Sequence, residues 1–167
     1  AGTTGGPGAR PSKDGLSATA YPSGVRGTPV EINESVAPII FWRKEYNLDS
    51  GGAGKYRGGL GQVIEIESAI DADLELLAAF DRIEYPPRGR AGGGNGLSGS
   101  VSLASGAMLR GKGAQSIKKG ERLIIYTPGG AGYGCPEERE PSLIELDLRS
   151  GLVSRGSAEN DYGLTIE

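Results

Sequence analysis

Residues 49–61 read Asp-Ser-Gly-Gly-Ala-Gly-Lys-Tyr-Arg-Gly-Gly-Leu-Gly, and a strand-like segment lies on each side of them. Residues 38–46, before the stretch, are rich in aromatic and β-branched side chains, a composition typical of strands. In residues 62–67, after the stretch, Ile64 and Ile66 alternate with glutamates, which predicts a strand with one buried face. The glycine-rich stretch is therefore predicted to be a tight connection between two strands.

A phosphate-binding loop is the main alternative for this stretch, and its pattern does not fit. A Walker loop needs Ser or Thr directly after Gly-Lys and then a helix, whereas Tyr56 follows Gly54-Lys55 here and a strand comes next. A dinucleotide-binding fingerprint also requires a helix after its glycines. The glycines are better explained by close backbone approach and positive φ, with Tyr56 and Arg57 as anchors of the loop.

Composition supports a mainly β fold. The chain has 30 glycines in 167 residues, about 18%, against a usual level of about 7%. Apolar residues make up 37% and occur in runs of strand length, so we expect short antiparallel strands joined by glycine turns. The formal charge of −3 does not indicate a nucleic-acid partner.

Histidine is absent and cysteine occurs once, which excludes several kinds of site. A Ser-His-Asp or Cys-His arrangement cannot form within the chain, and Cys135 is predicted to be structural. A carboxylate site for a hard metal remains possible, although no segment has calcium-loop spacing. One cysteine allows no internal disulfide, and there is no run of about 18 apolar residues. The polar, glycine-rich first residues do not predict a signal peptide. We expect a cytoplasmic protein without a membrane partner.

Further strands are predicted from alternating apolar residues. They cover residues 30–33 as an edge strand and then residues 73–81, 101–103, 122–127 and 164–166. Residues 86–96 are predicted to be a long loop that Arg88 and Arg90 make basic, either a solvated loop or an anion site. Residues 128–134, rich in glycine, are expected to pack backbone against backbone with Tyr133 as an anchor.

The sequence changes character at Pro136. Pro141 suits the first turn of a helix, and Gly151 is a fitting terminator. The apolar stripe of this helix is expected to consist of Leu143, Ile144, Leu146 and Leu148. Ser154 is expected to cap a second short helix that runs to Asn160. These patterns divide the chain into a glycine-rich, mainly β domain, residues 1–135, and a short helical tail, residues 136–167.

Charged residues near the start of the chain form the most suggestive loop. Arg10, Lys13 and Asp14 lie in Gly8-Ala9-Arg10-Pro11-Ser12-Lys13-Asp14-Gly15. They fit a solvated turn, with Asp14-Gly15 as turn residues. They also fit a loop that holds Arg10 or Lys13 against an anion or a carboxylate of a partner.

Six motifs in this order resemble the C-terminal part of the hydantoinase B/5-oxoprolinase family. They are Gly-Ala-Arg-Pro-Ser-Lys-Asp-Gly at 8–15, Thr-Pro-Val-Glu at 28–31, Asp-Ser-Gly-Gly-Ala-Gly-Lys-Tyr-Arg-Gly-Gly at 49–59, Thr-Pro-Gly-Gly-Ala-Gly-Tyr-Gly at 127–134, Asp-Leu-Arg-Ser-Gly-Leu-Val-Ser at 147–154 and Asp-Tyr-Gly at 161–163. Each glycine-rich motif alone is weak, but six in register are specific, and the resemblance covers essentially the whole chain.

The resemblance implies a part of a multi-component hydrolase that acts on C–N bonds of cyclic amides. In this family a B chain pairs with an A chain of actin-like kinase fold, which binds ATP and phosphorylates the carbonyl oxygen of the substrate. The pair then opens a ring such as a hydantoin or 5-oxoproline. Related acetone and acetophenone carboxylases use the same activation to attach carbonate to a ketone, so a piece of such a carboxylase is the alternative. A non-catalytic assembly module of either complex is the third hypothesis.

The resemblance also sets expectations for partners, cofactors and sites. B chains are much longer, and their metal ligands lie in an N-terminal portion that this sequence does not match, so no catalytic or metal residue is carried over. The expected partners are an A-like ATP-binding component and the N-terminal part of the B component, in a hetero-oligomer. ATP and Mg²⁺ are expected on the partner, with no cofactor or metal on this chain. Arg10, Lys13 and Asp14 are candidate catalytic residues, and Tyr56 and Arg57 are candidate contacts with substrate or partner, because these positions match shared motifs.

Overall fold

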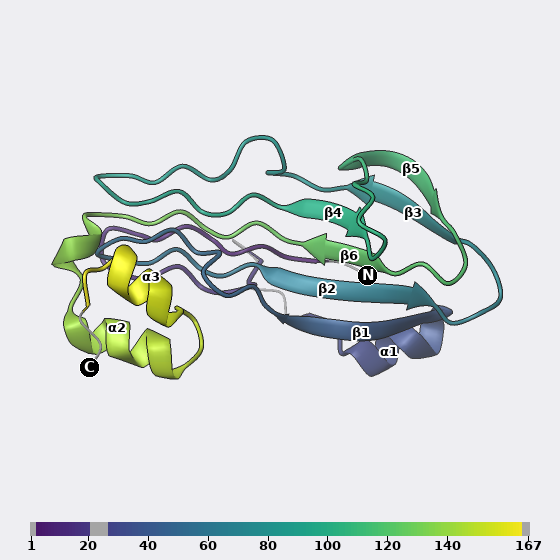
Figure 1. Cartoon of the computed structure of the whole chain (residues 1–167), viewed down its shortest axis with the longest axis horizontal. Helices are drawn as coiled ribbons and strands as arrows, with labels where there is room; N and C mark the ends of the chain where they lie inside the picture. The colour runs from purple at the N-terminus through teal and green to yellow at the C-terminus, as the bar shows by residue number, and fades with distance from the viewer. Residues whose placement is uncertain (1–2, 21–26, 165–167) are drawn as a thin grey trace.

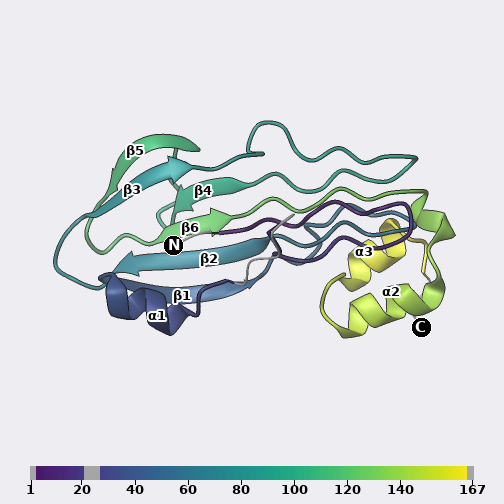
Figure 2. The same ribbon diagram turned by 180° about the vertical axis from the view of Figure 1, so that it is seen from behind.

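The computed structural model describes residues 3–20 and 27–164, and the molecule is elongated. A four-stranded sheet lies at one end and a pair of short helices at the other (Figure 1). Between them, long segments without helix or strand run side by side, and the view from behind shows the same arrangement (Figure 2). Strands and these extended segments therefore dominate, which confirms the predicted mainly β fold with a small helical C-terminal segment.

The larger sheet is antiparallel throughout. Its strands, in spatial order, are β1 (Ile39–Tyr46), β2 (Gln62–Ser68), β6 (Leu123–Tyr126) and β4 (Ser100–Leu103). The alternation predicted for β2 is confirmed, because Ile64 and Ile66 are buried whereas Glu65 and Glu67, which alternate with them, are only partly covered. The glycine-rich stretch at 49–61 thus connects two neighbouring strands, as the sequence predicts.

A second, two-stranded sheet packs against the first. β3 (Leu74–Ala79) pairs with β5 (Lys112–Ile117), which the sequence analysis missed. Ile117 joins buried side chains of β2, β4 and β6 in one core cluster, and β3 packs against this cluster. β5 reads Lys-Gly-Ala-Gln-Ser-Ile, in which large apolar and polar residues do not alternate, so the period-two signal is absent. Of these six residues only Ile117 is buried.

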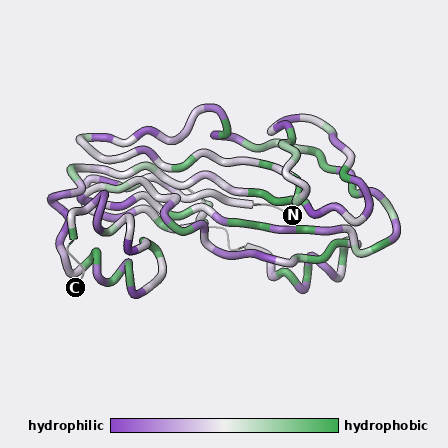
Figure 3. Tube along the Cα trace, in the orientation of Figure 1, coloured by the Kyte–Doolittle hydropathy of each residue, from purple (hydrophilic) through white to green (hydrophobic). Residues whose placement is uncertain are grey.

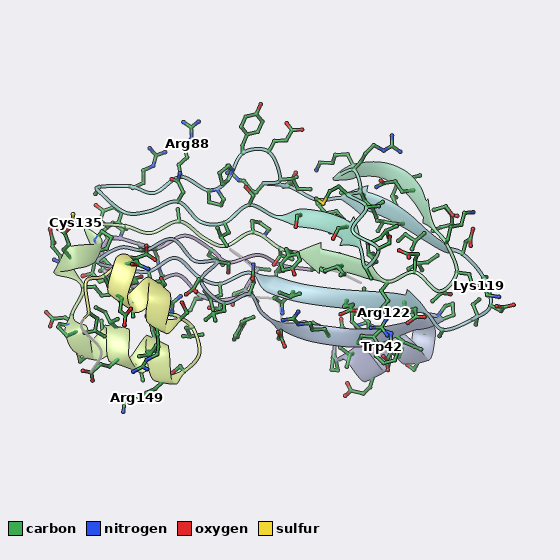
Figure 4. All side chains as sticks on the ribbon, viewed as in Figure 1. Trp42, Arg88, Lys119, Arg122, Cys135 and Arg149 are labelled. Atoms are coloured by element: carbon green, nitrogen blue, oxygen red, sulfur yellow. The ribbon has the colours of Figure 1, made fainter. Side chains whose placement is uncertain are left out.

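The opposite face of the larger sheet carries a charged and aromatic group. The Arg122 guanidinium lies 4.1 Å from the centroid of the Trp42 ring, a cation–π arrangement that Figure 4 labels. Arg122 also donates to Glu65 at 3.0 Å and to Glu67 at 3.3 Å. The alternating glutamates of β2 are therefore held by one arginine on the outer face.

The extended segments form a bundle with a three-residue repeat. Gly6 N–H donates to Pro128 O and Ala9 N–H donates to Ala131 O, three residues further along both segments. In the same way Gly129 N–H donates to Leu97 O, and Gly132 N–H to Gly94 O. Successive residues of 128–132 thus bond to different neighbours, as expected of polyproline II helices, which have three residues per turn and no internal hydrogen bonds.

This glycine bundle is held together by backbone rather than by apolar side chains. In Figure 3 its segments are mostly pale, whereas the most hydrophobic residues gather in the strands and helices. At Gly58 a Cβ would lie 2.0 Å from Gly130 O, and at Gly6 it would lie 1.9 Å from Gly59 O. Only glycine permits such an approach. The segments at 86–96 and 128–134 both belong to the bundle, so backbone packing at 128–134 is confirmed.

Residues 30–33 do not form the predicted edge strand. They begin helix α1 (Val30–Val36), which lies beside β1. Pro29 precedes the first helical residue with its φ already fixed at −52°, and the Asn33 amide donates to Pro29 O at 3.1 Å. Ile32 is 52% exposed, so the apolar residues that suggested alternation lie on a helix that buries none of its residues.

The C-terminal helices follow the sequence prediction closely. A short 3₁₀ turn, η1 (Pro136–Glu138), precedes α2 (Pro141–Arg149) and α3 (Arg155–Asn160). Pro141 occupies the first turn of α2, and the Ser154 hydroxyl accepts from Ser157 N–H at the start of α3. The strand predicted at 164–166 lies largely outside the described residues. No helix of the described residues is long and apolar enough to cross a membrane.

Candidate functional site

Four charged side chains from distant parts of the chain meet between the glycine bundle and α2. They come from the first loop, the glycine-rich stretch, the residue after η1 and the middle of α2: Asp14, Arg57, Arg139 and Asp147. We call these four residues the Arg–Asp cluster. Arg57 and Arg139 are each 4% exposed and Asp147 is 5% exposed. Buried charges of this kind require paired partners, and the cluster supplies them.

Arg57 uses all its side-chain nitrogens inside the molecule. Its Nε donates to Asp147 Oδ2 at 3.0 Å and its Nη2 to Asp147 Oδ1 at 3.3 Å, a two-point arrangement. Its Nη1 donates to Gly58 O at 2.7 Å. The backbone N–H of Arg57 donates to Asp14 Oδ1 at 2.8 Å. Arg57 therefore connects the glycine bundle to α2 and to the first loop.

Arg139 bridges the two aspartates. Its Nη2 donates to Asp14 Oδ2 and to Asp147 Oδ2, both at 2.7 Å. Its Nη1 donates to Asp14 Oδ1 at 2.8 Å and to Lys55 O at 3.1 Å. Its Nε is buried without a partner among the described residues. Two arginines and two aspartates thus balance in charge, and the carboxylates are saturated with donors.

The cluster keeps its groups charged. Burial raises the pKa of Asp14, but the hydrogen bonds and charge of Arg139, helped by the backbone N–H of Arg57, outweigh burial and hold that pKa below its ordinary value. Burial lowers the pKa of Arg139, yet the Asp14 carboxylate more than compensates and the pKa is raised. Neither group is poised to exchange a proton near neutral pH, so the cluster is suited to holding the fold rather than to acid–base catalysis.

Tyr162 closes the cluster on the side of α3. The Arg139 guanidinium lies 5.9 Å from the centroid of its ring. Tyr162 packs with Ile144, Val153 and Ala158 in a small apolar cluster of the C-terminal helices. Burial raises the pKa of the Tyr162 hydroxyl to about 12. The Asp-Tyr-Gly motif at 161–163 therefore supplies a neutral aromatic wall.

The buried face of helix α2 differs from the predicted one. The expected apolar stripe includes Leu143 and Leu146, which are 38% and 51% exposed. The buried residues of α2 are instead Ile144 and Asp147, spaced one turn apart. The prediction was wrong because apolar residues alone were counted toward the buried face, whereas the Arg57 and Arg139 charges draw Asp147 inward.

The five residues singled out from the sequence are only partly brought together. Asp14 and Arg57 are joined in the Arg–Asp cluster. Arg10 and Lys13 are exposed at a tight turn in which each backbone N–H donates to the other's carbonyl, at 2.9 and 3.3 Å. Tyr56 is half-buried and pairs with Tyr133 through two backbone hydrogen bonds of 3.0 Å. The side chains of Arg10 and Lys13 are thus accessible to a ligand, whereas the side chain of Arg57 is not.

Arg139 and Asp147 are cluster residues that the sequence analysis missed. Asp147 lies within the quoted motif at 147–154, but nothing in the sequence shows that it is buried. The signal that could have identified it is spacing. Asp147 follows Ile144 by three residues, so both lie on the same face of a helix that has few other buried positions. Among the described residues, no three His, Cys, Asp or Glu side chains are grouped so that they could hold a metal ion.

Comparison with known proteins places the chain beside ATP-dependent enzymes. The model of the Hydantoinase B/oxoprolinase family matches residues 1–136. Caprolactamase subunit beta of Pseudomonas jessenii is 32% identical over 149 residues, which cover 83% of this chain and 25% of that protein. A 5-oxoprolinase of Dictyostelium discoideum is 36% identical over 135 residues, covering 78% of this chain and 10% of that protein.

Two solved structures resemble nearly the whole chain. The ATP-dependent caprolactamase from Pseudomonas jessenii matches 99% of this chain with a TM-score of 0.84 and 29% identity. Nucleotide-free acetone carboxylase matches 98% with a TM-score of 0.74 and 25% identity. The chain covers 30% and 27% of those two chains, so it spans less than a third of each of these relatives.

Proposed function

Because the chain belongs to the hydantoinase B/oxoprolinase family, we propose that it is the C-terminal piece of the B component of an ATP-dependent cyclic-amide hydrolase. The reaction is the opening of a ring such as a hydantoin or 5-oxoproline. The piece is not catalytic alone and instead supplies a rigid framework that presents a few exposed side chains to the rest of the enzyme.

The observation that carries this proposal is the likeness to caprolactamase along nearly the whole chain. It covers 99% of this chain at a TM-score of 0.84, and that protein is ATP-dependent and named for a cyclic amide. The geometry supports a framework role, since every carboxylate oxygen of the Arg–Asp cluster accepts hydrogen bonds from within the chain. Carboxylates so saturated are committed to the fold and are not offered to a substrate.

The proposal includes partners and cofactors that lie outside this chain. An A-like component binds ATP and Mg²⁺ and activates the carbonyl oxygen, and the N-terminal part of the B component completes the hetero-oligomer in the cytoplasm. Arg10 and Lys13 remain the candidate catalytic residues because they are exposed at a fixed turn. Asp14 acts as a positioning residue, since its carboxylate holds Arg139 and the Arg57 backbone.

Two alternatives each have a supporting observation. A piece of a ketone carboxylase is supported by the likeness to acetone carboxylase, which covers 98% of this chain at a lower TM-score of 0.74. A non-catalytic assembly module is supported by the Arg–Asp cluster, which joins distant segments without exposing a reactive group.

The decisive experiment is an assay of the complete complex, purified through a tag on this chain. We expect ATP- and Mg²⁺-dependent release of a ring-opened product from at least one of hydantoin, 5-oxoproline and caprolactam, without bicarbonate. The chain alone should give none. Incorporation of labelled bicarbonate into acetone or acetophenone, with no ring opening, would assign the complex to the carboxylase branch. A complex inactive in both assays would contradict the enzyme proposal.

A further inference from the structure

We propose that a groove lined by Arg82, Arg88 and Arg90 is a docking surface for an extended acidic segment of a partner protein. The groove lies between residues 82–90, in the connection from β3 to β4, and the two bundle segments that contain Gly6 and Gly130. This inference goes beyond the proposed function, because it concerns how the chain is held by another protein and does not depend on which reaction the complex performs.

The groove is broad, with a volume of about 660 Å³. Besides the three arginines it is lined by small or rigid residues and one tyrosine: Gly6, Gly8, Tyr85, Pro86, Pro87, Pro128, Gly130 and Ala131. Among the described residues no carboxylate lines the groove. The glycines leave room for the backbone of a second chain to lie close, as they do within the bundle itself.

Two of the three arginines, Arg82 and Arg90, have hydrogen-bonded backbone. Arg90 N–H donates to Gly132 O at 3.1 Å, and Gly134 N–H donates to Arg90 O at 3.0 Å. Arg82 O accepts from Gly99 N–H at 3.0 Å, and Arg82 holds a φ of 59°, which is uncommon for a residue other than glycine. The positions from which these two guanidinium groups extend are therefore preorganised for a partner, which lowers the entropy lost on binding.

The charges that line this groove are all positive. Several exposed cations elsewhere are paired with carboxylates at 2.6–3.1 Å, as Lys112 is with Asp81, Lys118 with Asp73 and Lys55 with Glu138. Within residues 3–20 and 27–164, the three groove arginines form no ion pair, and Figure 4 shows Arg88 extending away from the ribbon. A local excess of positive charge on a chain of net charge −3 indicates an anionic partner.

The shape favours an acidic protein segment over a small anion. All three arginines are exposed, and an isolated anion in contact with exposed cations gains little in water. An extended segment with several Asp or Glu residues can instead pair with the arginines together while its backbone passes the glycines of the groove.

The test measures binding of a fluorescein-labelled peptide of twelve glutamates to the full chain at low salt. The groove variant is Arg82→Gln/Arg88→Gln/Arg90→Gln. The matched control is Arg110→Gln/Arg149→Gln/Arg155→Gln, which changes three exposed arginines elsewhere and alters net charge equally. We expect the groove variant to weaken binding at least tenfold and the control to change it less than threefold. Arg82→Lys/Arg88→Lys/Arg90→Lys should restore most of the binding if the groove variant has lost charge rather than fold.

Each other outcome overturns the proposal. Equal weakening by the groove and control variants means that only net charge matters. Unchanged binding in the groove variant removes the groove as the site. Saturable binding of inorganic phosphate or ATP to the groove, with no binding of the glutamate peptide, assigns the groove to a small anion instead. Binding that is insensitive to salt between 20 and 200 mM contradicts an electrostatic contact.

Discussion

Arg57 and Asp147 form a buried, two-point ion pair across 90 residues of sequence, with Nε–Oδ2 at 3.0 Å and Nη2–Oδ1 at 3.3 Å. Their side chains are 5% and 8% exposed. The pair fastens α2 to the glycine-rich stretch that connects β1 and β2. Because both partners have lost their water, the pair matters most through the cost of breaking it.

Replacing Asp147 should therefore destabilise the fold strongly. Asp147→Asn leaves two buried arginines with one carboxylate, and we expect a loss of about 3–5 kcal/mol in the free energy of unfolding. Urea denaturation followed by circular dichroism measures it. Glu145→Gln, an exposed change on the same helix, should stay within about 0.5 kcal/mol of the wild type. Equal stability of the two variants would show that the buried pair is dispensable.

The glycine bundle predicts opposite effects for two glycine-to-alanine changes. A Cβ at Gly58 would lie 2.0 Å from Gly130 O, so Gly58→Ala should cost at least about 3 kcal/mol or prevent folding. At Gly156, in α3, the nearest atom to a Cβ is 3.8 Å away, so Gly156→Ala should stabilise by about 0.5–1 kcal/mol. Thermal melts of both variants provide the comparison, and a Gly58→Ala protein as stable as the wild type would refute close packing there.

Part of the stability that the protein loses in acid should be lost through protonation of Asp14. Its pKa is held below the ordinary 3.8 in the folded state, so its contribution is complete above that value and is lost as the pH falls through the lower, folded pKa. The difference in unfolding free energy between the wild type and Asp14→Asn should be largest near pH 7 and shrink below pH 4. Denaturation series from pH 7 to pH 2.5 measure it, with exposed Glu159→Gln as a control. A difference that does not vary with pH would exclude this linkage.

Arg10 and Lys13 remain the residues to test in the complete enzyme. We expect Arg10→Ala or Lys13→Ala to lower turnover by at least about tenfold, or about 1.4 kcal/mol in the barrier, while the complex stays assembled. A cation on a fixed turn can stabilise an anionic intermediate or hold an acidic residue of a partner. Arg149→Ala, an exposed change on α2, serves as the control. Full activity in both variants would favour the assembly module.

The regular strands and the C-terminal helices could be predicted because their signals are local. Alternation in β2 and β3 reports a face that each strand buries by itself, and Ser154 caps α3 through a hydrogen bond within three residues. The prediction of a strand at 30–33 was wrong because, in so short a segment, Val30 and Ile32 fit the period of a helix as well as that of a strand. The helix that forms there buries none of its residues.

The glycine bundle and the Arg–Asp cluster depend on partners that are far away in sequence. Nothing local shows that Gly58 faces Gly130, or that Asp147 faces Arg57, since these contacts exist only once the segments are assembled. The sequence did identify Asp14 and Arg57 through shared motifs, but as a candidate catalytic residue and a candidate contact rather than as two members of one buried cluster. Motif matching finds residues that matter and leaves their physical role open.

The bundle has a calorimetric consequence. Unfolding a typical domain raises the heat capacity by about 12–15 cal/mol/K per residue, because apolar surface becomes hydrated and outweighs the opposite contribution of polar surface. The bundle segments, held by N–H···O bonds between glycines such as Gly52 and Gly130, expose mainly peptide groups on unfolding. The heat-capacity increment of this chain should lie below the usual range for its length, and its stability should vary less steeply with temperature, on cooling as well as on heating.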